Sequence, residues 1–471
     1  MCTGIEIKAR GVLFALLLIA GCAHYPLNRP LEPSRTSPSY VFPEKTSDLN
    51  SDGLFICLVF SGGGTRAAAL SYGVLEKLRE TRIVWKGKEK LLLDEVDCIS
   101  SVSGGSFTAA YYGLFGESLF KDFRPLFLEK DIQSELLKKS LSPANWFRLA
   151  SPYFSRIDLA SEYYDDCLFR HKTFSDLAGS WRRPFLIINA TNMATGERFE
   201  FTQPEFNVLG SDLGAYPVAR AVAASSAFPI LLSPISLKNY PASSEVKFGE
   251  DMRLGEKDFY TNRRRYQWAI NRTCYEDTGR YPYMHLMDGG LADNIGLRPI
   301  DTAYRRSSGF IRRLINRGSI EKLVIIIVNA RTEGQDEISK NEKSPGTMTV
   351  AMKTATVAMD NYSFESIELI KDLRDQRKQA QRTLNSLREK LGAGLGVGII
   401  PRFPNDVEPY VIDIDFAAIK DPEQRRYFLG LPTSFKLSHD QVEKLVSIGG
   451  ELLAADPEFK ELMAELGKST P

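Results

Sequence analysis

The fold class is set by residues 54–78, which read LFICLVFSGGGTRAAALSYGVLEKL. The first part, Leu54–Phe60, is apolar throughout, as is typical of a strand buried on both faces of a parallel sheet. A glycine-rich turn follows, and Ala67–Leu78 carries apolar residues along one side of a helix. A buried strand, a tight turn and a helix in this order predict an α/β fold, with a mostly parallel sheet flanked by helices.

The turn between this strand and this helix contains three consecutive glycines, Gly62, Gly63 and Gly64. Such a turn can point its N–H groups outward in front of a helix N-terminus and so form an anion site. A nucleotide-binding P-loop would need a lysine, which the turn lacks. A dinucleotide fingerprint is matched only in part, because Ala67 stands where the third glycine would be. The glycines therefore predict an anion site, with a tight turn that binds no ligand as the alternative.

A second strand–turn–helix unit follows at residues 96–115. Val96–Ser100 predicts a short strand, and the turn after it reads SVSGGS at residues 101–106. This is the layout of a nucleophile elbow, in which Ser103 would present its hydroxyl above the sheet. Small residues must flank that serine because the backbone comes close to itself, and Ser101 replaces the first glycine of the usual pattern. A serine-rich turn that only caps the helix is the alternative.

A nucleophilic serine needs a base, and the histidines do not supply a convincing one. After Ser103, histidines occur at His171, His285 and His439. His171 lies in a charged stretch, His439 fits the start of a helix, and His285 lies in a strand-like run where it could face either way. We therefore expect none of the three to be catalytic.

The strand that contains His285 ends in a carboxylate, Asp288, which Gly289 and Gly290 follow. The ends of buried strands are where α/β sheets place their chemistry. A carboxylate there could accept the serine proton directly, provided that burial keeps its basicity high. Asp293 is the competing carboxylate, but it does not stand at a strand end.

Four short motifs, in their order along the chain, resemble the patatin-like phospholipases. That family cleaves lipid esters with a serine–aspartate dyad and a glycine-rich oxyanion loop. The motifs lie within about residues 54 to 300 and are Gly62-Gly63-Gly64-Thr65-Arg66, Ser101-Val102-Ser103-Gly104-Gly105, Ala224-Ser225-Ser226-Ala227-Phe228-Pro229 and Asp288-Gly289-Gly290. The resemblance implies a three-layer α/β fold with a mostly parallel sheet between helices and a helical C-terminal extension.

The resemblance also implies roles for individual residues. Ser103 would be the nucleophile that forms the acyl-enzyme, and Asp288 would deprotonate it and later activate water. The N–H groups that would hold the oxyanion are those of Gly62, Gly63 and Gly64. Arg66 would fix that loop or attract a phosphate head group. The other supporting residues would be Gly104 and Gly105.

The function implied is a serine acyl hydrolase that acts on membrane phospholipids or related acyl esters, with no metal and no dissociable cofactor. An acyltransferase, in which an alcohol replaces water at the same acyl-enzyme, is the alternative within enzymes. A lipid-binding lipoprotein without catalytic activity is the alternative from another class.

The composition of the 471 residues excludes two other kinds of chemistry. Sixty Lys and Arg against 59 Asp and Glu give a net charge of +1, so bulk charge would not hold a nucleic acid. The 4 histidines stand apart, with no His-x-x-x-His pair and no Cys-x-x-Cys pair, so we expect no zinc site.

The first 21 residues resemble a bacterial lipoprotein signal peptide. A basic segment precedes Val12–Ala20, an apolar run that is too short to span a bilayer. The run continues into Gly21 and Cys22, the order of a lipobox, which predicts cleavage before Cys22 and a lipid on its thiol. Ala23 in the next position is compatible with the outer membrane of a Gram-negative type. The sequence thus predicts an exported, membrane-anchored lipoprotein, with an ordinary signal peptide as the alternative.

Three further segments complete the predicted organisation. Residues 22–50 are rich in proline and serine and lack periodicity, which predicts an extended tether between anchor and domain. The catalytic domain is expected over residues 51–335. The remaining residues, 336–471, are expected to be mainly helical and packed on the catalytic domain.

Other elements are predicted outside the motifs. Two more buried strands that should extend the sheet are Phe185–Asn192 and Leu323–Ala330. Apolar residues at helical spacing between Ile367 and Leu391 predict an amphipathic helix of about 30 residues that docks on the core. Whether Cys167 and Cys274 form a disulfide stays open.

Overall fold

The structure is a computed structural model that describes residues 23–32, 39–43, 50–51, 53–179, 183–229, 231–333, 342–392 and 407–467. The predicted signal peptide over residues 1–21 and the predicted lipidation residue Cys22 lie outside this part of the chain. The central sheet consists of β2 (Leu54–Phe60), β5 (Val96–Val102), β6 (Phe185–Asn192), β7 (Arg198–Glu200), β9 (Ile235–Lys238), β10 (Tyr283–Asp288), β11 (Lys322–Asn329) and β12 (Pro409–Asp415). Two small pairs of strands lie outside it, β1 (Arg29–Pro30) with β8 (Ser211–Asp212) and β3 (Arg82–Trp85) with β4 (Lys88–Leu91).

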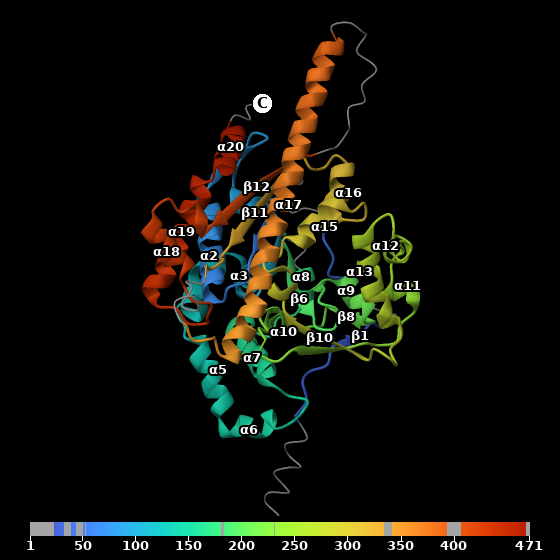
Figure 1. Cartoon of the computed structure of the whole chain (residues 1–471), viewed down its shortest axis with the longest axis vertical. Helices are drawn as coiled ribbons and strands as arrows, with labels where there is room; N and C mark the ends of the chain where they lie inside the picture. Colours follow the sequence, from blue (N-terminus) through green and yellow to red (C-terminus); the bar gives the residue numbers. More distant parts are fainter. Residues whose placement is uncertain are drawn as a thin grey trace, which may run out of the picture.

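Helices flank this sheet (Figure 1), which confirms the predicted α/β class. The α-helices that precede β10 in the chain are α2 (Thr65–Glu80), α3 (Gly104–Phe115), α4 (Leu119–Phe123), α5 (Ile132–Leu141), α6 (Pro143–Leu149), α7 (Arg156–Tyr164), α8 (Phe174–Gly179), α9 (Gln203–Val208), α10 (Val218–Ser225), α11 (Ser244–Lys247), α12 (Glu250–Gly255) and α13 (Arg263–Thr273). Those after it are α14 (Gly290–Asp293), α15 (Arg298–Arg305), α16 (Phe310–Asn316), α17 (Thr347–Gly392), α18 (Pro422–Leu429), α19 (His439–Ala455) and α20 (Pro457–Leu466).

The sheet is mixed, and its order is β12-β11-β2-β5-β6-β10-β9, with β7 paired to β6. The five neighbours β12, β11, β2, β5 and β6 run parallel, while β10 is antiparallel to β6 and β9 is antiparallel to β10. Every residue of β2 and β5 is buried, as the continuous apolar run at Leu54–Phe60 predicts. The strands predicted at Phe185–Asn192 and from Leu323 onward are present as β6 and β11.

The C-terminal region packs closely on the domain that carries the motifs. All of its strand β12 pairs with β11, from Leu323 to Asn329, so the central sheet crosses the predicted boundary between residues 335 and 336. Its helix α19 lies against α2, where a Cβ on Gly73 would overlap the carbonyl oxygen of Val446. Such an approach of two helix backbones is open only to glycine.

The long helix α17 begins earlier than the amphipathic pattern predicts, at Thr347 rather than near Ile367. In Figure 1 it crosses the front of the molecule, with its C-terminal part extending beyond the other elements. Ile367 and Ile370 are buried, in agreement with the predicted docking on the core. No helix in the described ranges is both long and apolar enough to cross a bilayer.

The predicted tether is wrong for the part of residues 22–50 that the structure describes. The side chain of Asn28 is buried and donates to the Ser211 hydroxyl (2.8 Å) and to the Lys238 carbonyl oxygen (2.9 Å). Residues 29–30 form the strand β1, which pairs with β8. Tyr40 is buried in the core. Because these polar groups and rings find partners on the body, proline and serine content alone does not keep the segment extended in solvent.

The four described cysteines are free. Cys57 and Cys98 are buried side by side on β2 and β5, as small apolar residues would be. Cys167 and Cys274 are half-buried thiols, so the structure has no bridge between them.

The contact between α2 and α19 can be tested by adding one methyl group. We expect Gly73→Ala to lower the free energy of unfolding by about 1–3 kcal/mol, because the new Cβ would push α19 away from α2. Gly450→Ala is the matched control in the same pair of helices, since its Cβ would have 3.5 Å to its nearest neighbour. That control should leave stability unchanged or raise it by up to about 1 kcal/mol. Urea denaturation followed by circular dichroism measures both, and equal effects of the two substitutions would contradict the tight contact.

Candidate active site

Ser103 lies on the sharp turn between β5 and α3. Its backbone has φ 47° and ψ −119°, a conformation that residues with side chains rarely adopt. The glycines after it let the turn close. A Cβ on Gly104 would overlap the carbonyl oxygen of Gly64, and one on Gly105 would lie 2.7 Å from that of Ser61. A strained serine between a buried strand and a helix is the geometry that a nucleophile elbow requires.

Asp288 lies near Ser103 although its strand is not one of the parallel strands, which the sequence did not indicate. It ends β10, which is antiparallel to its neighbour β6 and not part of the parallel set. On β6, Asn189 lies opposite Val102, the residue before Ser103. The next residue of β6, Ala190, lies opposite Asp288. This register places the carboxylate and the nucleophile at the same level of the sheet.

The carboxyl of Asp288 is held in a dry environment. Its residue is 1% exposed, and Ser103 is 8% exposed. The carboxylate accepts a hydrogen bond from the backbone N–H of Gly290 at 2.8 Å. Burial raises the pKa of Asp288 to about 7, although this bond and a hydrogen bond from the Ser103 hydroxyl act in the opposite direction. A carboxylate that is normally a weak base is thereby made basic enough to take a proton near neutral pH.

The glycine-rich loop offers two free backbone donors rather than the predicted three. The N–H of Gly62 donates to the carbonyl oxygen of Asn294 (2.9 Å), so it is already engaged. The N–H groups of Gly63 and Gly64 have no acceptor among the described residues. Their φ values of 140° and 61° are ones that glycine adopts without strain. Of the three glycines expected to bind the oxyanion, Gly62 is therefore already used by a long-range contact, which leaves Gly63 and Gly64 as the candidate donors.

Arg66 connects the end of the glycine-rich loop to two segments that are distant in the sequence. Its guanidinium is buried, and its nitrogens donate to the carbonyl oxygens of Ala330 (2.9 Å) and Leu431 (2.6 Å) and to the hydroxyl of Thr433 (3.0 Å). Burial lowers the pKa of Arg66 to about 10, which still leaves the group charged at neutral pH. Of the two roles considered for it, these contacts support holding the loop, since the guanidinium is buried and each of its three nitrogens already donates to a protein oxygen.

Ser225, at the end of α10, is a supporting residue whose role the sequence analysis missed. Its hydroxyl accepts a hydrogen bond from the Ser103 N–H (2.9 Å) and donates one to the carbonyl oxygen of Asn189 (2.6 Å). The carbonyl oxygens of Ser225 and Ala227 accept from the N–H groups of Gly289 and Asp288, respectively. The segment thus connects the elbow to the strand that carries the base. Its motif was visible in the sequence, but these partners are more than 35 positions away.

The alternative bases lie elsewhere. His285 is exposed and contacts the Ser236 hydroxyl (2.8 Å), because alternation along β10 places it on the face opposite Asp288. His171 is exposed and contacts Asp165 (2.9 Å). Asp293 is buried, but its carboxylate accepts from the backbone N–H of Arg298 at the start of α15. The structure brings none of these groups to Ser103.

The helix α17 covers the site. Met359 on this helix is buried and lies so close to Gly290 that a Cβ there would overlap its terminal methyl group. Gly290 is in turn the residue whose N–H binds Asp288. The helix α17 therefore contributes to the exclusion of water from the carboxylate.

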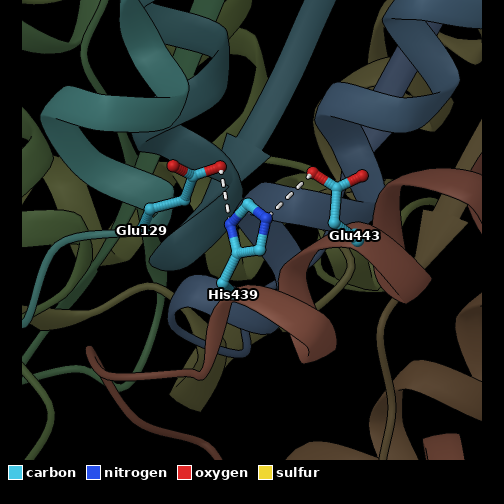
Figure 2. A group of neighbouring side chains, drawn as sticks. All are labelled: Glu129, His439 and Glu443. Atoms are coloured by element: carbon cyan, nitrogen blue, oxygen red, sulfur yellow. Dashed lines mark ion pairs between the residues drawn. The ribbon is translucent and has the colours of Figure 1, made fainter.

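One group of side chains in the described part of the chain has the types and proximity of metal ligands, namely Glu129, His439 and Glu443. Figure 2 shows the imidazole between the two carboxylates, with Nδ1 3.3 Å from Glu129 Oε1 and Nε2 3.9 Å from Glu443 Oε1. Both carboxylates are also paired with Arg124, and all three residues are solvent-accessible. With a guanidinium already among them, the group is an ion-pair network. His439 begins α19, as predicted.

Searches of curated proteins and of solved structures give no curated relative and only distant structural similarities. Among curated proteins no relative is found. Among solved structures, the chain is similar to human GIVD cytosolic phospholipase A2, with 12% identity, a TM-score of 0.44, and coverage of 88% of this chain and 62% of that one. It is also similar to VipD from Legionella pneumophila, with 14% identity, a TM-score of 0.24, and coverage of 88% and 71%. The chain thus spans less than two thirds of the human protein's length.

A family model gives the firmer result. The model for patatin-like phospholipases matches residues 58–303, which is more than half of the chain. The match includes the glycine-rich loop, Ser103 and Asp288. On this match the chain belongs to the patatin-like phospholipase family.

Proposed function

We propose that the protein is a lipid acyl hydrolase that cleaves phospholipids or related acyl esters through a Ser103–Asp288 dyad. The observation that carries the proposal is a strained serine beside a buried carboxylate whose pKa is raised to about 7. Family membership supports a lipid ester as the substrate. The absence of a histidine from the described surroundings of Ser103 supports a dyad rather than a triad.

In the acylation step, the ionised Asp288 takes the proton of the Ser103 hydroxyl while its oxygen attacks the ester carbonyl carbon. Negative charge then develops on the carbonyl oxygen, where the N–H groups of Gly63 and Gly64 can bind it. One such donor is worth about 2.7–4 kcal/mol in a comparable hydrolase. As the C–O bond breaks, Asp288 returns the proton to the departing alcohol, and the acyl group stays on Ser103.

In the deacylation step, water replaces the alcohol. Asp288 takes a proton from this water, whose oxygen attacks the acyl carbon and forms a second oxyanion at the same donors. Collapse of this intermediate breaks the bond to Ser103 Oγ, which regains its proton from Asp288. The free fatty acid leaves, and both residues return to their starting states.

We also propose that the protein is exported and anchored through a lipid on Cys22, in the outer membrane of a Gram-negative type. The order of small residues and cysteine directly after the apolar run supports this. An anchor would hold the enzyme at a surface made of its substrate. A net charge of +1 is compatible with it, since a covalently anchored domain needs no strongly basic surface.

The nucleophile can be tested by covalent labelling. We expect a fluorophosphonate probe to label the full chain in detergent micelles, and we expect Ser103→Ala to abolish labelling because the attacking oxygen is gone. Ser308→Ala, a substitution of an exposed serine, should label like the parent. Persistent labelling of Ser103→Ala would refute the assignment, and an unlabelled parent would favour the non-catalytic alternative. Product analysis with an added alcohol separates hydrolysis from acyl transfer.

The base can be tested by pH dependence. Because Asp288 must be ionised to accept a proton and its pKa is about 7, kcat/KM should fall as the pH drops below about 7. Asp288→Asn should lower kcat/KM by about 10²–10⁴-fold. His285→Ala, on the opposite face of the same strand, should keep both the rate and the profile. An acidic limb near the ordinary aspartate value, or loss of activity in His285→Ala, would identify a different base.

The anchor can be tested by metabolic labelling. Cells that express the protein should incorporate labelled palmitate into the parent chain and not into Cys22→Ser, because the thiol that accepts the lipid is removed. Cys167→Ser is the matched control, since that thiol is free and half-buried. Palmitate in the Cys22→Ser protein would rule out lipidation at this residue.

A further inference from the structure

We infer that an exposed apolar patch on α5, α6 and the segment directly after α6 is the surface by which the domain contacts a phospholipid bilayer. The patch consists of Leu137, Leu141, Trp146, Phe147 and Tyr153. Leu141 is 61% exposed and Trp146 is 56% exposed, although both are large apolar side chains. Leu137 and Leu141 lie one helical turn apart on α5, and Trp146 and Phe147 lie on α6, which packs against α5. Exposed apolar side chains gathered on neighbouring helices are the usual mark of an interaction site. Contact of this patch with a membrane is a separate property from the proposed chemistry at Ser103.

The described part of the N-terminal segment begins at residue 23, beside this patch. The carbonyl oxygen of Ala23 accepts a hydrogen bond from the Ser151 hydroxyl (2.6 Å), and the N–H of Tyr25 donates to the carbonyl oxygen of Tyr153 (2.8 Å). The ring of His24 stacks on that of Tyr153, with 5.2 Å between centroids. Ala23 is therefore seated on the body directly after α6.

This seating limits where a lipid on Cys22 could lie. Cys22 is joined to Ala23 by one peptide bond. A lipid on that residue would leave the body beside the α5–α6 patch. The placement rests on the proposed anchor, whereas the exposure of the patch does not.

The charge around the patch suits an anionic bilayer. Between residues 130 and 156 there are five basic and two acidic side chains, in a chain whose total charge is only +1. Two of the five basic side chains are paired with carboxylates, Lys138 with Glu135 and Arg148 with Glu162. Lys138 and Lys139 lie on α5 between Leu137 and Leu141. Aromatic and apolar side chains with neighbouring lysines are typical of surfaces that lie at a membrane interface.

The patch also lies on the side of the sheet that carries the chemistry. The N–H of Thr65, directly after the glycine-rich loop, donates to the carbonyl oxygen of Ser434 (2.9 Å). The next carbonyl oxygen, that of Phe435, accepts from the N–H of Gln133 in the first turn of α5 (3.4 Å). From there α5 and α6 extend away from the body at its lower end in Figure 1. Contact of this hairpin with a bilayer would bring lipid to the edge of the active site.

Tryptophan quenching tests the inference without relying on catalysis. The full chain, with and without Cys22→Ser, is mixed with phosphatidylcholine–phosphatidylglycerol vesicles that contain a brominated phosphatidylcholine, which quenches tryptophan inside the bilayer. We expect quenching in both proteins, and we expect Trp146→Phe to abolish it while keeping an apolar side chain in the patch. Trp268→Phe on α13 is the matched control and should leave the quenching intact.

A second pair of variants keeps Trp146 as the reporter. Leu137→Ser/Leu141→Ser/Phe147→Ser should lose the quenching and lower hydrolysis of vesicle phospholipid by about tenfold or more, because its apolar area no longer enters the bilayer. Hydrolysis of a soluble short-chain ester should be unchanged. Leu254→Ser/Phe259→Ser/Tyr260→Ser, with three exposed apolar residues of α12 and the segment before α13, should behave like the parent.

Three results would overturn the inference. The tryptophans of the parent chain could remain unquenched, whether or not the chain co-sediments or co-floats with the vesicles in a density gradient. Quenching could persist in Trp146→Phe, which would place another face at the bilayer. The parent could show no quenching while the patch variant changes the oligomeric state, as measured by light scattering. The patch would then be covered by a second copy of the chain and not by a bilayer. If instead no ester is hydrolysed by any variant, the proposed function fails while the quenching still decides the docking surface.

Discussion

Close backbone contact between two turns is the constraint on which the rest of the site depends. The start of α3 can meet the glycine-rich loop only because Gly104 has no side chain to occupy the space at Gly64. That contact requires β2 and β5 to be neighbouring parallel strands, so that both turns leave the sheet at the same edge. The strained backbone of Ser103 is stabilised by the bond from its N–H to Ser225. The elbow, the glycine-rich loop and α10 are thus parts of one packed unit.

The local parts of this unit could be predicted from the sequence, because short-range chemistry determines them. A continuous apolar run indicates a buried strand, and a serine between small residues indicates a tight turn, wherever they occur. The position of Asp288 was predicted correctly for an incomplete reason. Asp288 lies beside Ser103 because the antiparallel strand β10 overlaps β6 by only three residue pairs, the last of which is Asp288 with Ala190. No pattern within β10 encodes that register.

The features that could not be predicted are all set by distant partners. Gly62 looks equivalent to its two neighbours in the sequence, and only the carbonyl oxygen of Asn294 distinguishes it. Residues 23–32 have the composition of a linker, yet Asn28 is bonded to two segments more than 180 positions away. A composition that permits an extended chain does not prevent it from packing when specific partners are available. Family resemblance pointed to the residues of the candidate site, while their hydrogen-bond partners became visible only in the structure.

The cover provided by α17 has a consequence for what the enzyme can accept. Burial is the main cause of the high pKa of Asp288, and Met359 is part of what buries it. Moving this helix to admit a substrate would let water reach the carboxylate and weaken it as a base. A long hydrocarbon chain that fills the vacated space would restore the dry surroundings, whereas a small polar ester would leave them wet. Selectivity for long-chain, hydrophobic substrates would then arise from the basicity of Asp288 as well as from the fit of the acyl group.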